Sequence, residues 1–151
     1  MPLTERLFAY GTLRLGCGHS LTRMAAASVG YLGPGRLPGK LYDLGAYPGA
    51  VFDPAARSWI SGDVFVLRQP ETVLRVLDRY EGFDPGAPDC GEFRREWLPI
   101  DLGGRSRWCW VYLYKQPVDS LTPIPGGDYL RARFAPAQTR PEREAPGVHR
   151  V

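Results

Sequence analysis

Hydrophobic residues occur in short runs along this chain, and glycine or proline separates most of the runs. Short runs rich in aromatic and β-branched residues predict strands, and the Gly and Pro between them predict tight turns. The segments expected to be extended are 6–14, with a tight turn around Gly11 and Thr12, then 30–45, 47–53, 61–67, 92–102 and 105–114. The many Gly and Pro residues in 30–45 predict two short strands around a kinked connection. Gly103 and Gly104 separate the last two segments and predict a hairpin.

The segment 69–82 has the period of an amphipathic helix rather than that of a strand. Pro70 fits the first helical position, and Glu71 suits the first turn. Gly82 suits the position just past the helix end. The apolar stripe of this helix is expected to consist of Val73, Leu74, Val76, Leu77 and Tyr80.

The segment 105–114 carries apolar residues on both of its faces, since side chains alternate along a strand. One face holds Trp108, Trp110, Tyr112 and Tyr114, and the other holds Cys109, Val111 and Leu113. A strand that is apolar on both faces is expected in the middle of a sheet, covered on both sides. The alternative for the aromatic face, with Arg105 and Arg107 beside it, is a stacking platform for single-stranded nucleic acid.

Two further short helices are expected, one over 19–27 with Ser20 as its cap and one over 126–134. From residue 135 the chain is polar and interrupted by proline, which is typical of a disordered segment. The sequence therefore predicts one domain over 1–134 and a flexible C-terminal tail over 135–151.

Composition narrows the choice of fold and partner. A length of 151 residues fits a single domain, and 18 Gly with 15 Pro favour a β-rich fold of short elements. The formal charge of +3, from 19 basic and 16 acidic residues, is too balanced to indicate nucleic acid as a partner. No apolar run is long enough for a signal peptide or a membrane span, so we expect a cytoplasmic protein without a membrane partner.

The cysteines do not form a recognisable reactive motif. Cys17, Cys90 and Cys109 are an odd number without CxxC spacing, which indicates reduced thiols rather than a disulfide framework or a zinc site. Cys17 lies two residues from His19, but a thiol nucleophile needs its base within hydrogen-bond reach and a third group to orient that base. Neighbours this close in sequence rarely achieve that geometry, so a buried or incidental Cys17 is the preferred interpretation.

A phosphate-binding loop is also excluded by its own spacing. The segment 33–40 ends in Gly-Lys, but Pro34 stands where GxxxxGK requires its first glycine. Leu41 follows in place of Ser or Thr. The Gly and Pro residues in this segment more simply indicate a kink between strands.

The stretch LDRYEGF (77–83) places Glu81 at the end of the predicted helix, where the partial negative charge of the helix terminus disfavours a carboxylate. The helical positions i−4 and i−7 are Leu77 and Leu74, so the Glu81 side chain is expected to face the core or its boundary. Burial raises the pKa of a carboxylate toward the range that is useful for proton transfer. Glu81 is therefore a candidate catalytic residue, with an exposed helix end as the alternative.

Four stretches occur together in a familiar order: FAYGTLR (8–14), LGAYPGAV (44–51), GDVFVL (62–67) and LDRYEGF (77–83). With them, over about residues 6 to 130, the chain resembles the γ-glutamylcyclotransferase-like superfamily, also called AIG2-like. The stretch 110–130 is similar to its small bacterial members. The resemblance implies an α+β fold, a small mixed β-barrel with a few peripheral helices.

The resemblance also implies a site and a reaction. Glu81 would be the acid/base, and the backbone amides of Tyr10, Gly11, Thr12 and Leu13 would receive the γ-glutamyl group of a small-molecule substrate. Glycine at position 11 would allow positive φ and close approach of the backbone. The implied reaction is intramolecular attack of the substrate's α-amine on its γ-carbonyl, which releases 5-oxoproline and an amine or amino acid. No metal and no cofactor are implied.

One residue departs from the family pattern. Phe93 stands where many relatives carry a tyrosine, so a hydroxyl that could touch the substrate is missing. A ligand-binding module that keeps the pocket without turnover is therefore an alternative to an enzyme. A nucleic-acid-binding barrel is a third interpretation.

Overall fold

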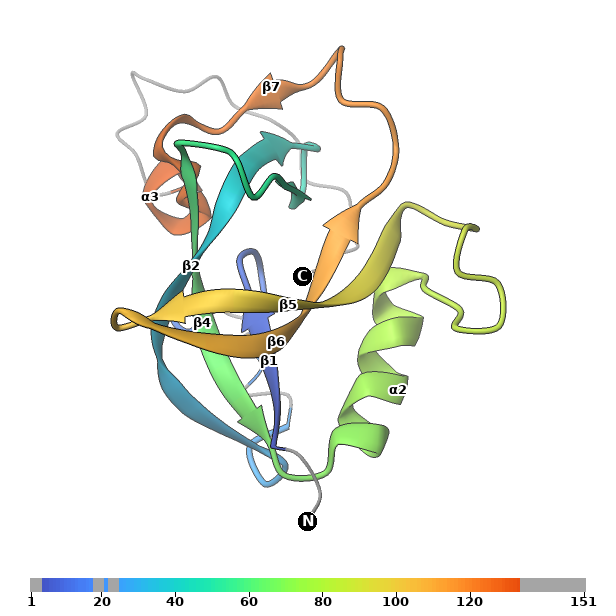
Figure 1. Cartoon of the computed structure of the whole chain (residues 1–151). Coiled ribbons are helices and arrows are strands. Elements are labelled where there is room, and N and C mark those ends of the chain that lie inside the picture. The colour runs from blue at the N-terminus through green and yellow to red at the C-terminus, as the bar shows by residue number, and fades with distance from the viewer. Residues whose placement is uncertain (1–3, 18–20, 22–24, 134–151) are drawn as a thin grey trace.

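The structure of the chain is a computed structural model, and it describes residues 4–17, 21 and 25–133. The strands are β1 (Glu5–Ala9), β2 (Val29–Asp43), β3 (Pro48–Phe52), β4 (Trp59–Leu67), β5 (Phe93–Leu102), β6 (Arg105–Tyr114) and β7 (Thr122–Pro123) (Figure 1). The helices are α2 (Pro70–Glu81), the short 3-10 helix η1 (Pro125–Gly127) and α3 (Tyr129–Arg133). Helix α2 lies beside the strands, near the ends of β5 and β6 (Figure 1).

Five of these strands close into a barrel. Hydrogen-bonded neighbours follow the order β2, β4, β1, β6, β5, and β5 returns to β2 where Asp101 pairs with Arg36. Strands β1 and β6 are parallel at Leu7 and Trp110, whereas the other pairs of the ring are antiparallel. The expected small mixed β-barrel with a few peripheral helices is therefore confirmed. Strands β3 and β7 pair with the end of β2 that extends beyond the ring.

Strand β2 corrects the expectation of two short strands over 30–45. It is one strand of 15 residues with a bulge between Tyr31 and Gly33. Its first part pairs with β4, and its last part, from Gly39, pairs with β3. Gly33 and Gly39 have φ angles of 149° and 148°, which side chains disfavour. These two glycines let the strand bend and change partner without ending.

The predicted hairpin is confirmed. Strands β5 and β6 pair along their whole length, and Gly103 and Gly104 turn between them with φ angles of 61° and 86°. Positive φ at both central residues is the requirement of a type I′ turn, which matches the twist of the flanking strands. Strand β6 lies between β1 and β5, as expected for a strand that is apolar on both faces.

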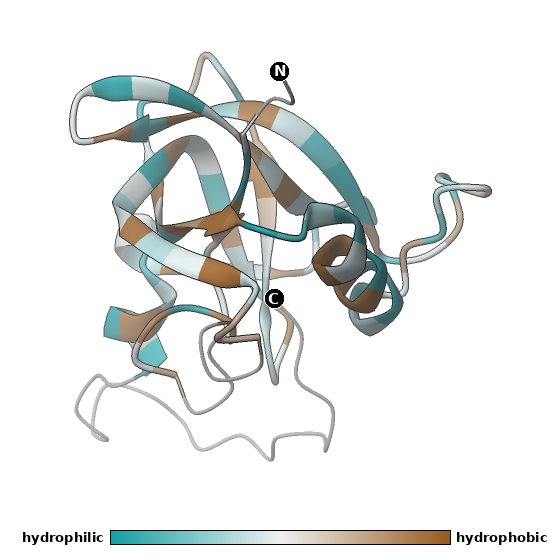
Figure 2. Ribbon diagram, turned by 90° about the horizontal axis from the view of Figure 1, so that it is seen from below, coloured by the Kyte–Doolittle hydropathy of each residue, from teal (hydrophilic) through white to brown (hydrophobic). Residues whose placement is uncertain are grey.

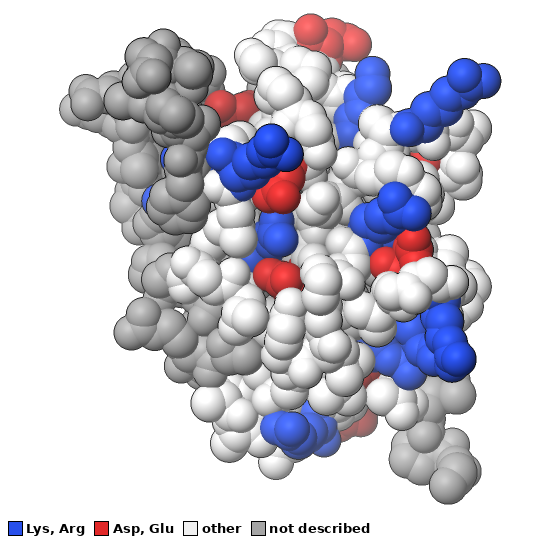
Figure 3. All heavy atoms as spheres, turned by 90° about the vertical axis from the view of Figure 1, so that its left-hand side faces the viewer, with Lys and Arg blue, Asp and Glu red and all other residues white. Residues whose placement is uncertain are grey.

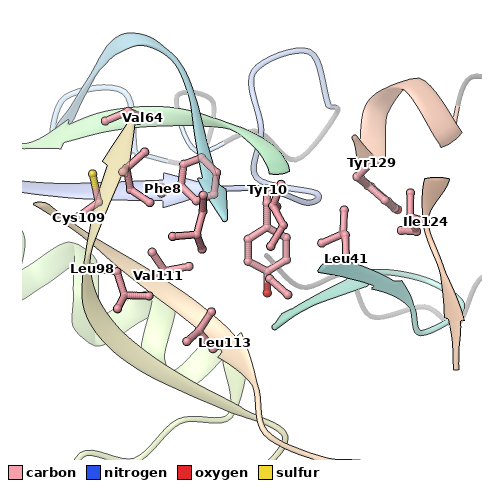
Figure 4. Packing of buried hydrophobic residues seen from close by; sticks show 14 residues of the cluster. Phe8, Tyr10, Leu41, Val64, Leu98, Cys109, Val111, Leu113, Ile124 and Tyr129 are labelled. Carbon is pink, nitrogen blue, oxygen red and sulfur yellow. The ribbon is translucent and has the colours of Figure 1, made fainter. Parts of the chain in front are cut away.

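Strand β6 contributes to two hydrophobic clusters. The first lies inside the barrel and includes Phe8, Tyr10, Leu41, Val64, Cys109, Val111 and Leu113 (Figure 4). The second lies between the barrel and α2 and includes Leu7, Leu13, Leu74, Leu77, Phe93 and Tyr112. Tyr112 is fully buried and only Trp108 of the aromatic face is largely exposed, at 49%. The aromatic face is therefore mainly core and not a continuous stacking platform.

Helix α2 begins and ends where the sequence predicts. Pro70 is its first residue, and Gly82 ends it in the left-handed conformation with φ 72° and ψ 25°. Leu74 and Leu77 are buried as predicted, but Val76 is 56% exposed, so its place in the predicted stripe is wrong. A helix turns about 100° per residue, which places Val76 about 130° away from the centre of the face formed by the buried residues. Figure 2 views α2 nearly along its axis, with hydrophobic and hydrophilic residues on different sides.

The C-terminal elements agree only in part with the prediction. Helix α3 occupies part of the predicted helix 126–134, but Gly126 and Gly127 form the turn of η1 with φ angles of 75° and 64°. The predicted tail over 135–151, and most of the predicted helix over 19–27, lie outside the described residues. Among the helices of the described residues, none is long and apolar enough to cross a bilayer.

Candidate active site

The segment from Tyr10 to Leu13 leaves the end of β1 and is buried throughout. Tyr10 and Leu13 are fully buried, and Thr12 is only 4% exposed. The Arg14 amide donates a hydrogen bond of 3.1 Å to the Gly11 carbonyl and closes the turn. The predicted tight turn around Gly11 and Thr12 is thus present, at the point where β1 meets the barrel interior.

Gly11 does not adopt the positive φ that a glycine at this position would allow. The glycines with positive φ in the described residues lie elsewhere, and the nearest is Gly16 with φ 96°. The chain therefore reverses with normal φ at Gly11. Gly11 is buried between two buried neighbours, Tyr10 and Thr12. Its carbonyl oxygen also accepts a hydrogen bond from the Cys17 thiol, with 3.7 Å between the sulfur and the oxygen.

A buried ion pair holds this turn on the barrel. Arg14 is 8% exposed, and its Nε donates to Asp63 Oδ2 at 3.2 Å while its Nη1 donates to Asp128 Oδ1 at 3.0 Å. Asp63 of β4 also accepts the Leu15 amide at 3.0 Å and the Tyr31 hydroxyl at 3.2 Å. No local sequence pattern indicates this anchor, although Arg14 and Asp63 both lie inside the stretches that carry the family resemblance.

The anchor predicts a large loss of stability when Asp63 is removed. Removing Asp63 leaves the buried Arg14 guanidinium with only the partly exposed Asp128 as its ion-pair partner, so Asp63→Ala is expected to lower the free energy of unfolding by about 3 kcal/mol. The matched control, Tyr31→Phe, removes one neutral donor to the same carboxylate and is expected to cost about 1 kcal/mol or less. Urea denaturation measures both, and equal losses in the two variants would contradict the anchoring role.

Glu81 is the last residue of α2 and is fully buried. The residues at i−4 and i−7, Leu77 and Leu74, are 1% and 6% exposed. The prediction that Glu81 faces the core is therefore confirmed, and the exposed helix end is excluded. Gly82 makes this possible, because its left-handed conformation ends the helix directly after the carboxylate and turns the chain away.

Two buried tyrosines indicate where the Glu81 carboxylate lies. Burial, and next the negative charge of Glu81, raise the pKa of the Tyr10 phenol well above its ordinary value. Burial and the hydrogen bond to Asp78 raise the pKa of Tyr112, and the charge of Glu81 raises it further. The carboxylate is thus close enough to act on both phenols. The fold brings the predicted acid/base and the first residue of the predicted binding segment together.

The side chain of Tyr10 makes hydrogen bonds to two strands that do not pair with each other, β6 and β3. Its hydroxyl donates to the main-chain carbonyl of Tyr112 in β6, at 2.5 Å. The amide of Ala50 in β3 hydrogen-bonds the same phenol and lowers its pKa in part. In Figure 4 the Tyr10 ring lies in the interior between Leu41 and Leu113. The family resemblance implies only a backbone role for Tyr10, and no sequence signal indicates these contacts of its side chain.

Asp78 lies one turn before Glu81 on α2 and is 7% exposed. Arg95 of β5 donates to both of its carboxylate oxygens, at 2.8 and 3.1 Å, and the Tyr112 hydroxyl donates to Oδ1 at 2.6 Å. The Arg95 guanidinium also lies 4.3 Å from the ring centroid of Trp110. These contacts fix the last turn of α2 to β5 and β6, and so fix the position of Glu81.

Phe93 is fully buried at the start of β5. The centroid of its ring lies 5.6 Å from the centroid of the Tyr114 ring and 6.1 Å from the centroid of the Tyr47 ring. The Tyr47 hydroxyl donates to Glu92 Oε2 at 2.9 Å. Position 93 therefore offers an apolar wall with two phenols beside it.

The structure gives little support to three other kinds of site: a thiol nucleophile at Cys17, a metal site and a nucleic-acid surface. Burial raises the pKa of the Cys17 thiol, which disfavours the nucleophilic thiolate, and His19 lies outside the described residues. Within the described part of the chain, no group of three or more His, Cys, Asp and Glu side chains could hold a metal ion. Arg36 Nε lies 2.7 Å from Asp101 Oδ2. On the face shown in Figure 3, basic side chains lie beside acidic ones. That face offers no strip of positive charge for nucleic acid.

The fold and these contacts define a class of protein: a small mixed β-barrel with a buried glutamate at a helix end, next to a buried turn that follows the first strand. A family model described as gamma-glutamyl cyclotransferase, AIG2-like, matches residues 7–131. The chain therefore belongs to the AIG2-like gamma-glutamyl cyclotransferase family.

Individual relatives agree with this membership. The gamma-glutamylcyclotransferase family protein YtfP of Escherichia coli K12 is 33% identical over 127 residues, which are 83% of this chain and 96% of that protein. Its solution structure has a TM-score of 0.55 to this one at 30% identity, over 83% of this chain and 96% of that chain. An AIG2-like protein from Mus musculus shares the fold, with a TM-score of 0.64 at 22% identity over 85% of this chain and 89% of that chain.

Proposed function

We propose that the protein is a γ-glutamyl cyclotransferase that releases 5-oxoproline from a γ-glutamyl amide, with Glu81 as general acid and base. The observation that carries the proposal is the fully buried Glu81 beside Tyr10, the first residue of the buried turn. A buried carboxylate at a helix end is unexpected unless it has a function, because burying a charged group costs free energy that an exposed carboxylate would not cost. Moving a proton in a water-poor site is such a reason.

The reaction requires little beyond positioning and one proton transfer. The substrate's own α-amine attacks its γ-carbonyl, a carbon–nitrogen bond forms, and a five-membered lactam closes. Glu81 as carboxylate accepts the proton that the attacking amine loses. Glu81 then returns this proton to the leaving nitrogen as the original amide bond breaks. The proton count balances on one side chain, and the products are 5-oxoproline and a free amine or amino acid.

The buried turn would supply the donors. Backbone amides from Tyr10 to Leu13 would bind the substrate's α-carboxylate and the oxyanion that develops on the γ-carbonyl. Such donors act best when they are fixed before the substrate arrives. The ion pair of Arg14 and Asp63 directly after this segment supports that requirement.

A ligand-binding module without turnover remains the second candidate, and the observation that favours it is Phe93. A buried phenyl ring at this position offers no hydroxyl to a ligand. A binding module would retain affinity for 5-oxoproline or a γ-glutamyl compound but release no product.

A substrate panel separates the two candidates. The panel comprises a γ-glutamyl amino acid, a γ-glutamyl dipeptide, a γ-glutamyl polyamine and Nε-γ-glutamyl-lysine, with 5-oxoproline release as the readout. The α-linked isomers and the N-acetylated γ-glutamyl compounds are matched controls, because neither can close the lactam and expel the amine. Release from at least one panel member and from no control is expected. Binding of panel compounds without any release would favour the binding module.

A further inference from the structure

The short helix α3 starts with two consecutive side chains that reach two different segments of the candidate site. Asp128 Oδ1 accepts a hydrogen bond of 3.0 Å from Nη1 of Arg14, which directly follows the buried turn 10–13. The Tyr129 hydroxyl donates to the main-chain carbonyl of Ala46 at 3.3 Å. Ala46 belongs to the loop 44–47, which connects β2 to β3. The start of α3 therefore holds the turn with one residue and the loop with the next.

The turn and the loop come together at β6. The turn begins with Tyr10, whose hydroxyl donates to the Tyr112 carbonyl. The loop leads directly into β3, where a Cβ on Gly49 would lie 2.9 Å from Cβ of Tyr114. The two contacts on β6 are only two residues apart. The turn and the β3 side of the loop are thus two neighbouring walls of the region that contains Tyr10.

Helix α3 has a fixed base from which to hold both walls. Tyr129 is 4% exposed and belongs to the cluster inside the barrel, together with Ile124 (Figure 4). The Ile124 amide donates to the Leu41 carbonyl at 2.7 Å. At Gly127 a Cβ would collide with the Trp59 carbonyl, so the chain before α3 packs directly on β4. Asp128 and Tyr129 therefore extend from a backbone that is itself attached to the barrel.

We propose that Asp128 and Tyr129 are positioning residues of the γ-glutamyl pocket: Asp128 fixes the turn through Arg14, and Tyr129 fixes the loop 44–47 through Ala46. The consequence for the reaction rests on the proposed function, whereas the fixing of the two segments is a property of the folded protein alone. A pocket with walls that are ordered in advance spends less binding free energy on ordering them. Loosening either wall therefore weakens substrate binding, and bound substrate restores the arrangement for the chemical step.

Two substitutions remove one contact each. Tyr129→Phe removes only the hydroxyl and leaves the ring in the core. Asp128→Ser removes the carboxylate that reaches Arg14, but a serine hydroxyl still caps α3, where Asp128 Oδ1 now accepts the Arg131 amide at 3.1 Å. The matched control is Ile124→Val, which trims a buried side chain of the same C-terminal segment and leaves both contacts in place. Urea denaturation compares the stability of the three variants.

The first readout is hydrogen exchange of four backbone amides by NMR, which needs no substrate. The Leu44 and Gly45 amides are hydrogen-bonded within the loop, to the Tyr47 carbonyl and to Asp43 Oδ1. The Arg14 and Leu15 amides are hydrogen-bonded at the turn, to the Gly11 carbonyl and to Asp63 Oδ2.

Tyr129→Phe is expected to speed exchange of the two loop amides by about threefold or more relative to Ile124→Val. Asp128→Ser is expected to do the same for the two turn amides. Exchange no faster than in Ile124→Val would overturn the role of the residue concerned. Should Asp128→Ser fail to fold, Asp128→Asn keeps the size, removes the charge and is judged by the same two amides.

The second readout is the division of the effect between KM and kcat. On an active panel substrate, Tyr129→Phe and Asp128→Ser are each expected to raise KM roughly 3- to 10-fold and to change kcat by about twofold or less. Ile124→Val is expected to change neither. A fall in kcat at unchanged KM would overturn the role in binding. A protein that releases no 5-oxoproline from any panel member contradicts the proposed function, and hydrogen exchange still decides on Asp128 and Tyr129.

Discussion

The Glu81→Gln variant is expected to lose about 100-fold or more of the 5-oxoproline release while its barrel stays folded. Glutamine has nearly the same size and occupies the same buried space, but its amide cannot accept a proton from the attacking amine and return it to the leaving nitrogen. In the mechanism proposed above both steps use this one side chain. The loss is therefore expected in kcat at least as much as in KM, since the proposal assigns substrate binding to the backbone amides of the turn and not to Glu81.

The matched control for this variant is Glu71→Gln, the same substitution in the first turn of the same helix. Glu71 is exposed, so its amide is expected to leave both turnover and fold unchanged. The initial rate of 5-oxoproline release on the best panel substrate measures both variants. A well-folded Glu81→Gln protein that keeps most of its activity would show that another group moves the proton.

The elements that the sequence predicts well are those with local signals. The hairpin follows from Gly103 and Gly104, which meet the φ requirement of their turn whatever the rest of the fold does. Helix α2 follows from Pro70 at its start and Gly82 at its end. The inward direction of Glu81 follows from its spacing to the buried leucines of the same helix. Each of these predictions depends on residues only a few positions apart.

The features that the sequence does not reveal depend on distant residues or on a neighbouring strand. The long β2 contains enough Gly and Pro to suggest a break, and its pairing with β4 and then β3 keeps it continuous. The Arg14 guanidinium meets Asp63 and Asp128 across 49 and 114 residues of sequence, a separation that no periodicity encodes. The Tyr10 hydroxyl reaches Tyr112 over 102 residues. The candidate site is built from such contacts, so its residues can be nominated from sequence but not its hydrogen bonds.

Gly11→Val is expected to lose nearly all turnover, because it would place a branched side chain at a buried position of the turn. Positive φ is not the reason, since the chain passes Gly11 with an ordinary φ. The reason is burial: Gly11 lies between the buried Tyr10 and Thr12, and its carbonyl already accepts the Arg14 amide. A valine side chain would displace the turn and its amides from the substrate. Losing one oxyanion donor costs about 10²–10³ in rate in well-studied enzymes.

The control for crowding is Thr12→Ser, which removes one methyl group at the next position and keeps the turn, so it is expected to retain most activity. Circular dichroism must first show that Gly11→Val is native-like, because a displaced turn could also unfold the end of β1. 5-Oxoproline, the expected product, supplies a readout that needs no turnover: it should bind wild type weakly and a folded Gly11→Val protein not at all. A folded Gly11→Val variant with normal turnover and normal product binding would show that the γ-glutamyl pocket does not lie at the turn. The burial of Glu81 beside Tyr10 would then need another explanation.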